Sequence, residues 1–280
     1  MRTLNWVKGH GTENDFLLLH DPDGREYDWV GAEAVRLLCD RRRGIGADGV
    51  LRVVRTDAVE AGRPYAGEAT WFMDFRNADG TVGEMCGNGV RVFARYLAET
   101  GLADPTDSVP VATRAGVKHV GFSTDGELLT VDMGTARFPE SDGLKITAGG
   151  RTWPGTAVDM GNPHSVSYVD DLSEPGALVE APSWEPAEVF PAGVNVEFAV
   201  RLGAHHLAMR VHERGVGETR SCGTGACAVA ATTARIDGVR APWTYQVDVP
   251  GGTLVIARRT DGHLEMTGPA VLTARGTLAL

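Results

Sequence analysis

The chain has 280 residues, and 27 Lys and Arg stand against 37 Asp and Glu, which gives a formal net charge of −10. Hydrophobic residues make up 42% and charged residues 23%, a composition typical of a globular chain and not of a disordered one. The acidic balance and the lack of basic runs exclude nucleic acid as the main expected partner. No apolar run reaches about 18 residues, and the polar start MRTLNWVKGHG does not resemble a signal peptide, so we expect no membrane partner and a cytoplasmic location.

Short runs rich in β-branched and aromatic residues predict strands along most of the chain. They cover residues 50–55, 70–75, 118–122, 128–133, 195–200, 206–212, 245–249 and 253–259. Three segments have the apolar spacing of helices instead, at residues 30–38, 90–97 and 226–233. Pro250-Gly251-Gly252 and Asp261-Gly262 predict hairpin turns between the last strands. We therefore expect an α/β (α+β) fold and, at about 150 residues per domain, two domains.

Glycine is in excess at 36 residues, about twice its usual share of about 7%. Part of the excess lies in two similar motifs, G-E-M-C-G-N-G at residues 83–89 and G-E-T-R-S-C-G-T-G at residues 217–225. Each motif directly precedes a predicted helix. The same cysteine–glycine–polar–glycine unit thus opens a helix in each half of the chain, which indicates a duplicated two-domain protein.

A cysteine immediately before a helix lies where unsatisfied N–H groups and the positive end of the helix dipole stabilise negative charge. We therefore expect the pKa of Cys86 and of Cys222 to be lowered, with thiolate accessible near neutral pH. Two such thiols on opposite sides of a carbon would invert it, one removing a proton and the other returning one. The backbone N–H groups suited to hold a carboxylate there belong to Gly87, Asn88, Gly223 and Thr224.

Six ordered segments carry a recognisable signature: KGHGTENDF (8–16), RRGIGADG (42–49), FRNADGTVGEMCGNGVRVFARY (75–96), DMGNPHSV (159–166), GVNVEF (193–198) and ERGVGETRSCGTGACA (213–228). Through them the sequence resembles the diaminopimelate epimerase family over essentially its whole length. The resemblance implies two similar domains, each a β-sheet wrapped around a central helix, with the active site in the cleft between them. It implies an N-terminal half at residues 1–125, joined by the last strand at 270–280, and a C-terminal half at 126–269.

The resemblance also implies a role for each site residue. Cys86 and Cys222 become the catalytic acid/base pair, and the four N–H groups named above bind the carboxylate beside the reacting carbon. Glu213 accepts the distal ammonium of the substrate or tunes the pKa of a cysteine, and His164 lies near the thiols and tunes them. The far end of the substrate is recognised by Asn14, Asn77, Asn162, Asn195 and Arg214, with the Arg214 fork on the distal carboxylate.

The activity implied by the resemblance is a PLP-independent isomerase reaction that interconverts LL- and meso-2,6-diaminopimelate. It belongs to lysine and peptidoglycan precursor biosynthesis. The expected partner is a small diamino diacid, without cofactor or metal, and the enzyme is expected to be a homodimer.

Other interpretations remain open. A related racemase for proline, hydroxyproline or histidine would share both cysteines, although proline-type relatives usually have His where this chain has Asn88. A non-enzymatic member of the family would have lost a cysteine, and a redox protein would use Cys86 and Cys222 as a reversible disulfide. Cys39 and Cys227 are expected in the core, and the spacing of Cys222 and Cys227 is poor for zinc.

Two further features have structural interpretations. Arg41-Arg42-Arg43 is expected to be a solvated helix end that complements the helix dipole. Asp48 is expected to serve the turn G-A-D-G.

Overall fold

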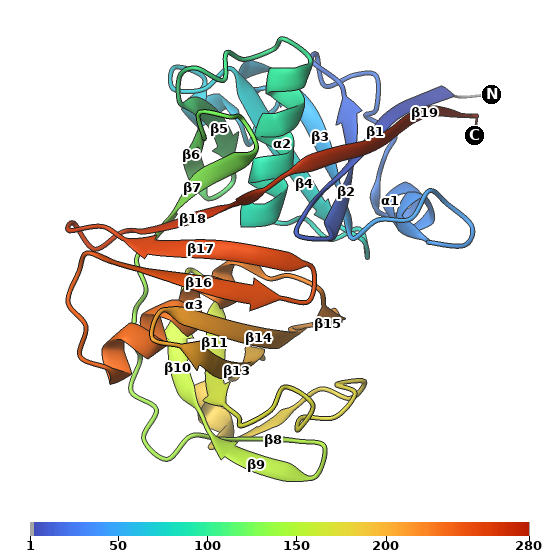
Figure 1. The fold of residues 1–280 in the computed structure, drawn as a ribbon. Helices are drawn as coiled ribbons and strands as arrows, with labels where there is room; N and C mark the ends of the chain where they lie inside the picture. The colour runs from blue at the N-terminus through green and yellow to red at the C-terminus, as the bar shows by residue number, and fades with distance from the viewer. Residues whose placement is uncertain (1–2, 280) are drawn as a thin grey trace. The chain divides into compact units, whose positions relative to one another are not determined.

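The computed structural model describes residues 3–279, which form two compact units (Figure 1). Unit 1 extends to Val131 and includes the chain again from Pro269, and unit 2 comprises Asp132–Gly268. The chain passes between the units within two strands, β7 (Leu128–Gly134) and β18 (Leu264–Pro269). The two ends of the chain therefore belong to the same unit.

Unit 1 is a sheet in the order β7-β6-β5-β4-β3-β2-β1-β19, and its final strand comes from the end of the chain. The central strands β2 and β3 pair in parallel and are apolar and buried along most of their length, as is typical of strands covered on both faces. The elements are β1 (Thr3–Gly11), β2 (Asn14–His20), α1 (Ala32–Cys39), β3 (Gly49–Arg55), η1 (Thr56–Ala58), η2 (Arg63–Tyr65), β4 (Trp71–Asn77), α2 (Gly87–Glu99), β5 (Val109–Thr113), β6 (Gly116–Phe122) and β19 (Val271–Ala279).

Unit 2 is a sheet in the order β10-β11-β13-β14-β16-β17-β18, with a separate three-stranded sheet in the order β12-β8-β9. Trp153 and Phe198 meet edge to face in the core between these layers, with ring centroids 5.4 Å apart. The elements are β8 (Lys145–Ala148), β9 (Arg151–Pro154), β10 (Thr156–Asp159), β11 (Pro163–Tyr168), β12 (Ser183–Glu185), η3 (Ala187–Val189), β13 (Asn195–Gly203), β14 (His206–Glu213), β15 (Gly217–Thr219), α3 (Gly223–Ile236), β16 (Trp243–Val249) and β17 (Gly252–Arg258).

The two units repeat one topology. In unit 1, successive pairs along β1-β2-β3-β4-β5-β6-β7 are antiparallel, parallel, antiparallel, parallel, antiparallel and antiparallel. In unit 2, the pairs along β10-β11-β13-β14-β16-β17-β18 follow the same series. In both units the central helix lies between the fourth and fifth strands of the series. The duplication predicted from the two cysteine motifs is confirmed.

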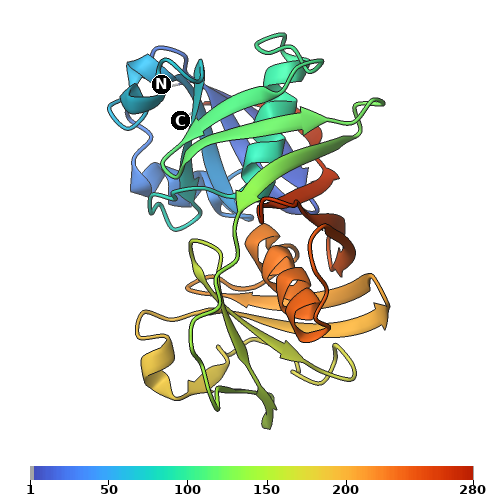
Figure 2. The same ribbon diagram turned by 90° about the vertical axis from the view of Figure 1, so that its left-hand side faces the viewer.

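Each sheet wraps around its helix. Helix α2 contacts β1, β2 and β19 at one side of its sheet and β5 and β6 at the other (Figure 2). Helix α3 contacts β10, β11, β13, β14, β16 and β17. A helix enclosed in this way has to be buried on most of its circumference. In α2, ten of thirteen residues are buried, and in α3, eleven of fourteen are buried. The buried residues of α3 are mostly alanine and other small residues. The expectation of a β-sheet around a central helix in each domain is confirmed.

Candidate functional site

Cys86 and Cys222 are the N-cap residues of the central helices α2 and α3. The Cys86 backbone is extended (φ −140°, ψ 119°), and its Sγ accepts the N–H of Gly89 at 3.5 Å. Cys222 repeats this arrangement (φ −125°, ψ 113°), and its Sγ accepts the N–H of Gly225 at 3.4 Å. Each sulfur therefore satisfies one of the N–H groups that a helix leaves unpaired in its first turn. The two motifs build the same local structure, as their sequences predicted.

A carboxylate lies directly against the N-terminus of α3. A Cβ atom at Gly225 would stand 2.7 Å from Glu197 Oε1, so a larger residue does not fit without a shift. At the matching position in α2, the nearest atom to a Cβ on Gly89 would be Cys86 Cβ, at an ordinary 3.4 Å. Position 225 therefore needs glycine for a steric reason, because Glu197 packs against it, and position 89 in unit 1 has no such neighbour.

Two asparagines, one of them fixed by an arginine, form a hydrogen-bonded chain that ends at Cys86 in unit 1. Asn14 Oδ1 lies 3.6 Å from Cys86 Sγ and accepts the Asn88 side-chain N–H at 3.2 Å. Asn88 Oδ1 in turn accepts from Arg91 Nη2 at 3.0 Å. Asn88 and Arg91 are buried within α2, so this chain of bonds is fixed from inside the unit. The structure places Asn14 beside the thiol group of Cys86.

The hairpin from β1 to β2 positions Asn14. Its two-residue turn, Thr12 and Glu13, has positive φ angles of 49° and 61°, as in a type I′ turn. Gly11 pairs with Asn14 across the hairpin, and a Cβ at Gly11 would stand 2.9 Å from Arg91 Nη2. The bare backbone at Gly11 therefore lets the hairpin approach α2 closely enough for Asn14 to reach the helix end.

His164 and Glu197 form a fully buried pair beside α3. His164 Nδ1 and Glu197 Oε1 are 2.6 Å apart, and both side chains are 0% exposed. His164 Nε2 lies 3.0 Å from Asn162 Oδ1, so both ring nitrogens are within hydrogen-bond distance of a partner. The short Nδ1–Oε1 contact holds one proton between the two groups. Glu197 Oε2 has no hydrogen-bond partner within the described residues 3–279.

The pKa of Cys222 differs from our expectation. Burial raises the pKa of the Cys222 thiol well above its usual value, and the negative charges of Glu213 and Glu197 raise it further. The Thr224 hydroxyl, 3.5 Å from Sγ, and the N–H of Gly225 act in the opposite direction but do not compensate. The prediction of a lowered thiol pKa was therefore wrong for Cys222, because desolvation in the folded unit outweighs the helix N-terminus.

Asn195 ties three strand ends together in unit 2. Its Nδ2 donates to the Pro163 carbonyl at 3.0 Å, and its Oδ1 accepts the backbone N–H of Arg214 at 3.0 Å. The exposed Arg214 side chain donates through Nη1 to the Ala192 carbonyl at 3.3 Å. Asn195 is 5% exposed, so in this structure its amide fixes the backbone from which Arg214 projects.

Two other predicted residues make local contacts. Glu213 ends β14 and accepts a short hydrogen bond from the Thr219 hydroxyl. Asn77 ends β4 and donates through Nδ2 to the Thr81 hydroxyl at 2.9 Å. These contacts hold the turns that follow β14 and β4.

Two residues near the cysteines were missed in the sequence. Glu197 sits in the run NVEFAV, where a carboxylate among buried strand residues was the available signal. Arg91 sits in the middle of α2 between two buried valines and is itself 0% exposed. In both cases the unusual feature is a charged side chain between two apolar sequence neighbours, all of which are buried.

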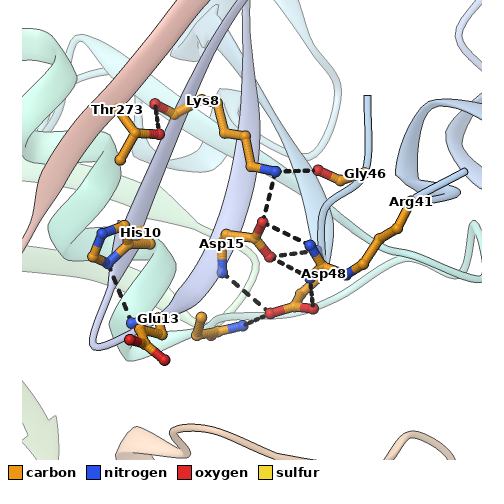
Figure 3. A network of polar contacts seen from close by, with 9 residues as sticks. Lys8, His10, Glu13, Asp15, Arg41, Gly46, Asp48 and Thr273 are labelled. Atoms are coloured by element: carbon orange, nitrogen blue, oxygen red, sulfur yellow. Dashed lines mark hydrogen bonds and ion pairs between the residues drawn. The ribbon is translucent and has the colours of Figure 1, made fainter. Parts of the chain in front are cut away.

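The interpretations of Arg41 and Asp48 need correction. Arg41 is not a freely solvated helix end, because its guanidinium binds Asp15 at 2.6 Å and Asp48 at 2.8 Å (Figure 3). Lys8 binds the same Asp15 at 2.9 Å. Asp48 therefore belongs to an ionic network and does more than shape its turn. Arg41 and Lys8 lower the pKa of Asp15, although burial acts to raise it.

Cys39 and Cys227 are buried, as predicted, and burial raises the pKa of the Cys39 thiol to about 12. In the part of the chain that the structure describes, no three His, Cys, Asp or Glu side chains lie together as a metal ion would require. None of the helices within residues 3–279 is both long and apolar enough to cross a membrane.

Comparison with known proteins identifies the family. The profile described as diaminopimelate epimerase matches residues 6–139 and 156–273. The diaminopimelate epimerase of Streptomyces coelicolor is 56% identical over 278 residues, covering 98% of this chain and 94% of the relative. That of Thermobifida fusca is 49% identical over 285 residues, covering 99% and 98%. The repeated fold and these relatives define an isomerase that acts as an epimerase. The chain belongs to the diaminopimelate epimerase family, which confirms the resemblance seen in the sequence.

More distant structures share the fold. A PhzF-family phenazine biosynthesis protein of Bacillus anthracis superposes with a TM-score of 0.74 at 17% identity, and 100% of each chain is covered. A hydroxyproline epimerase of Agrobacterium vitis superposes with a TM-score of 0.71 at 15% identity, covering 100% of this chain and 93% of the other. The two-unit fold thus occurs in proteins of divergent sequence.

Proposed function

We propose that this enzyme interconverts LL- and meso-2,6-diaminopimelate through proton transfer between Cys86 and Cys222. One observation carries the proposal: the two repeated units each present a cysteine as the N-cap of the central helix, with Sγ on the N–H three residues later. The relatives at 56% and 49% identity are diaminopimelate epimerases, which supports the choice of substrate. We propose that the two helix ends face one substrate, with its α-carbon between the sulfurs.

In the proposed reaction one cysteine is a thiolate and the other a thiol. The thiolate takes the α-proton, and the thiol gives its own proton to the opposite face of the carbon, so configuration inverts and the protons balance. The backbone N–H groups in the first turns of α2 and α3 hold the adjacent carboxylate while negative charge develops on it. They belong to Gly87, Asn88, Gly223 and Thr224. The two thiols supply both proton donor and acceptor, so the proposed step needs neither PLP nor another cofactor.

The raised pKa of Cys222 fits this scheme if the substrate helps to form the thiolate. The negative charge of Glu213 is among the causes that raise the pKa of Cys222. A substrate ammonium bound at Glu213 would neutralise that charge and make proton loss from Cys222 easier. We therefore propose that the Cys222 thiol loses its proton to solvent as the substrate binds. The proton held between His164 and Glu197 then limits the negative charge that Glu197 brings to the thiolate.

The distal end of the substrate is proposed to bind at Asn14, Asn77, Asn162, Asn195 and Arg214. Support comes from Arg214, an exposed guanidinium whose backbone is fixed by Asn195. A guanidinium binds a carboxylate through two parallel hydrogen bonds, which a second carboxylate on the substrate would supply. We also propose a role in lysine and peptidoglycan precursor synthesis, a cytoplasmic location and a homodimer. Light scattering of the purified protein tests the homodimer.

The test offers the purified enzyme LL-diaminopimelate, meso-diaminopimelate, proline, hydroxyproline and histidine in D₂O. We expect deuterium at an α-carbon of diaminopimelate, together with formation of the other stereoisomer, and no exchange on the remaining amino acids. Exchange on proline or hydroxyproline without exchange on diaminopimelate would contradict the proposed substrate. Exchange on none of them by folded, reduced protein would contradict the proposed activity.

A further inference from the structure

A chain of hydrogen bonds connects the loop before β3 to the thiol of Cys86. Arg41 Nη2 donates to Asp48 Oδ1 at 2.8 Å, and Asp48 Oδ2 accepts the Asn14 side-chain N–H at 2.9 Å. Asn14 Oδ1 then faces Cys86 Sγ at 3.6 Å. The proposed function assigns a proton-transfer role to Cys86 but none to Asp48 or Arg41.

The ends of this chain fix the orientation of both amides in it. At one end Arg91, which only donates, is bonded to Asn88 Oδ1, so Asn88 must turn its N–H toward Asn14. At the other end the carboxylate of Asp48, which only accepts, requires the N–H of Asn14. Turning either amide around would place two donors or two acceptors face to face. The Asn14 oxygen is therefore held toward Cys86, where it accepts a proton carried by the sulfur.

Asp48 is itself fixed by charge and by backbone. Arg41 bridges Asp48 to Asp15, which it contacts through Nη1 at 3.1 Å and through Nη2 at 2.6 Å (Figure 3). The backbone N–H of Asp15 donates to Asp48 Oδ2 at 3.1 Å, and Lys8 closes the network on the Asp15 carboxylate at 2.9 Å. The charged groups that these elements of unit 1 bring to the chain of bonds are Lys8, Asp15, Arg41, Asp48 and Arg91.

We propose that Asp48 is a positioning residue that acts through Asn14 to hold the proton of Cys86. The inference deepens the proposed function and rests on it, because it concerns the proton that Cys86 exchanges with substrate. With the Asn14 oxygen turned to the sulfur, the thiol form of Cys86 gains an acceptor, while a thiolate would face a carbonyl oxygen. The Gly89 N–H at 3.5 Å favours the thiolate in turn, so Asn14 and Gly89 oppose each other at one sulfur.

The test measures the reactivity of Cys86 without substrate. Trypsin releases Cys86 in the peptide 77–91, which contains no other cysteine, so mass spectrometry follows its alkylation by iodoacetamide apart from that of Cys39, Cys222 and Cys227. We expect Asp48→Asn to speed alkylation of Cys86 about fivefold at neutral pH, since a tenfold gain in thiolate corresponds to one pKa unit. Asp40→Asn is the matched control, because the Asp40 carboxylate lies in the same loop but binds Arg42 and Arg43, which lie outside the chain of bonds. It should leave the rate within about twofold.

A double-mutant cycle separates positioning from the loss of a charge. If Asp48 acts through Asn14, Asn14→Ala alone should speed alkylation, and adding Asp48→Asn should change the rate less than twofold. In turnover, Asp48→Asn should lower kcat about tenfold and change KM less than threefold. An undiminished effect of Asp48→Asn in the Asn14→Ala background, or an unchanged alkylation rate in the single variant, would overturn the inference. Because alkylation needs no substrate, these outcomes are distinct from failure of the wild-type enzyme to epimerise diaminopimelate.

Discussion

Replacing His164 with leucine should expose the cost of the buried carboxylate of Glu197. The two groups are 2.6 Å apart with both side chains 0% exposed, and Oε2 of Glu197 has no partner within residues 3–279. Removing one member of a buried ion pair costs about 3–5 kcal/mol, because the other charge stays buried without compensation. We expect His164→Leu to lower the free energy of unfolding by this amount near neutral pH.

The loss should depend on pH in a defined direction. Burial raises the pKa of Glu197, and His164 is the main group that lowers it, so leucine raises this pKa further. A carboxyl with a raised pKa in the folded state contributes full stability below its unfolded pKa of about 4.3. That contribution is lost as the pH rises through the folded pKa, by at most about 1.4 kcal/mol per unit. The penalty of His164→Leu should therefore be larger at about pH 8 than at about pH 5.5, and it grows by at most about 1.4 kcal/mol per pH unit.

Urea unfolding at these two pH values, followed by tryptophan fluorescence and circular dichroism, measures the penalty. His206→Leu is the matched control: His206 and Asp248 are also 2.6 Å apart, but their side chains are 39% and 33% exposed. It should cost less than about 1 kcal/mol at either pH, because exposed pairs contribute little. A His164→Leu penalty as small as that of His206→Leu, or one that is the same at both pH values, would refute the reasoning.

Three further outcomes are expected. Gly225→Ala places a Cβ 2.7 Å from Glu197 Oε1 and should lower the free energy of unfolding by about 1–3 kcal/mol. In the control Gly121→Ala the new Cβ meets no atom within 4 Å, and the change should be less than about 0.5 kcal/mol. Equal effects of the two variants would contradict the steric account. Arg214→Lys should raise KM for diaminopimelate about tenfold with a smaller change in kcat, and an unchanged KM would remove Arg214 from substrate binding. Asp21→Asn should lower the free energy of unfolding by about 3 kcal/mol near neutral pH, measured in urea. Burial acts to raise the pKa of Asp21, but an arginine and backbone N–H groups lower it, so the stabilisation by Asp21 disappears as the pH falls through that lowered pKa. A loss that persists at about pH 2 would count against this.

Local chemistry made the helices and their cysteine caps predictable. The apolar spacing of residues 90–97 and 226–233 and the glycine motifs before them depend on neighbours within a few positions, and α2 and α3 begin directly after Cys86 and Cys222. The eight strands predicted from β-rich runs are present. Strands β1 and β2 were missed because Gly9, Gly11 and Asn14 interrupt their alternation, and these residues serve the close approach to α2.

Tertiary neighbours could not be predicted in the same way. His164 and Glu197 are 33 positions apart and meet because β11 and β13 pair in parallel, which no local pattern indicates. The same holds for the pKa of Cys222: the helix N-terminus is visible in the sequence, but the burial that outweighs it exists only in the folded unit. The sequence likewise predicts that Arg41 is a solvated helix end, because no local pattern indicates that the fold places Asp15 and Asp48 beside it.

The turnover of single cysteine variants tests the central claim most directly. We expect Cys86→Ser and Cys222→Ser each to lower kcat for diaminopimelate epimerisation by at least about a thousandfold while circular dichroism remains that of the folded protein, because a hydroxyl is a far weaker acid than a thiol. Cys227→Ala, one turn further along α3 and buried, should retain most of the activity. Near-normal turnover by either serine variant would contradict a reaction in which both thiols exchange protons with the substrate.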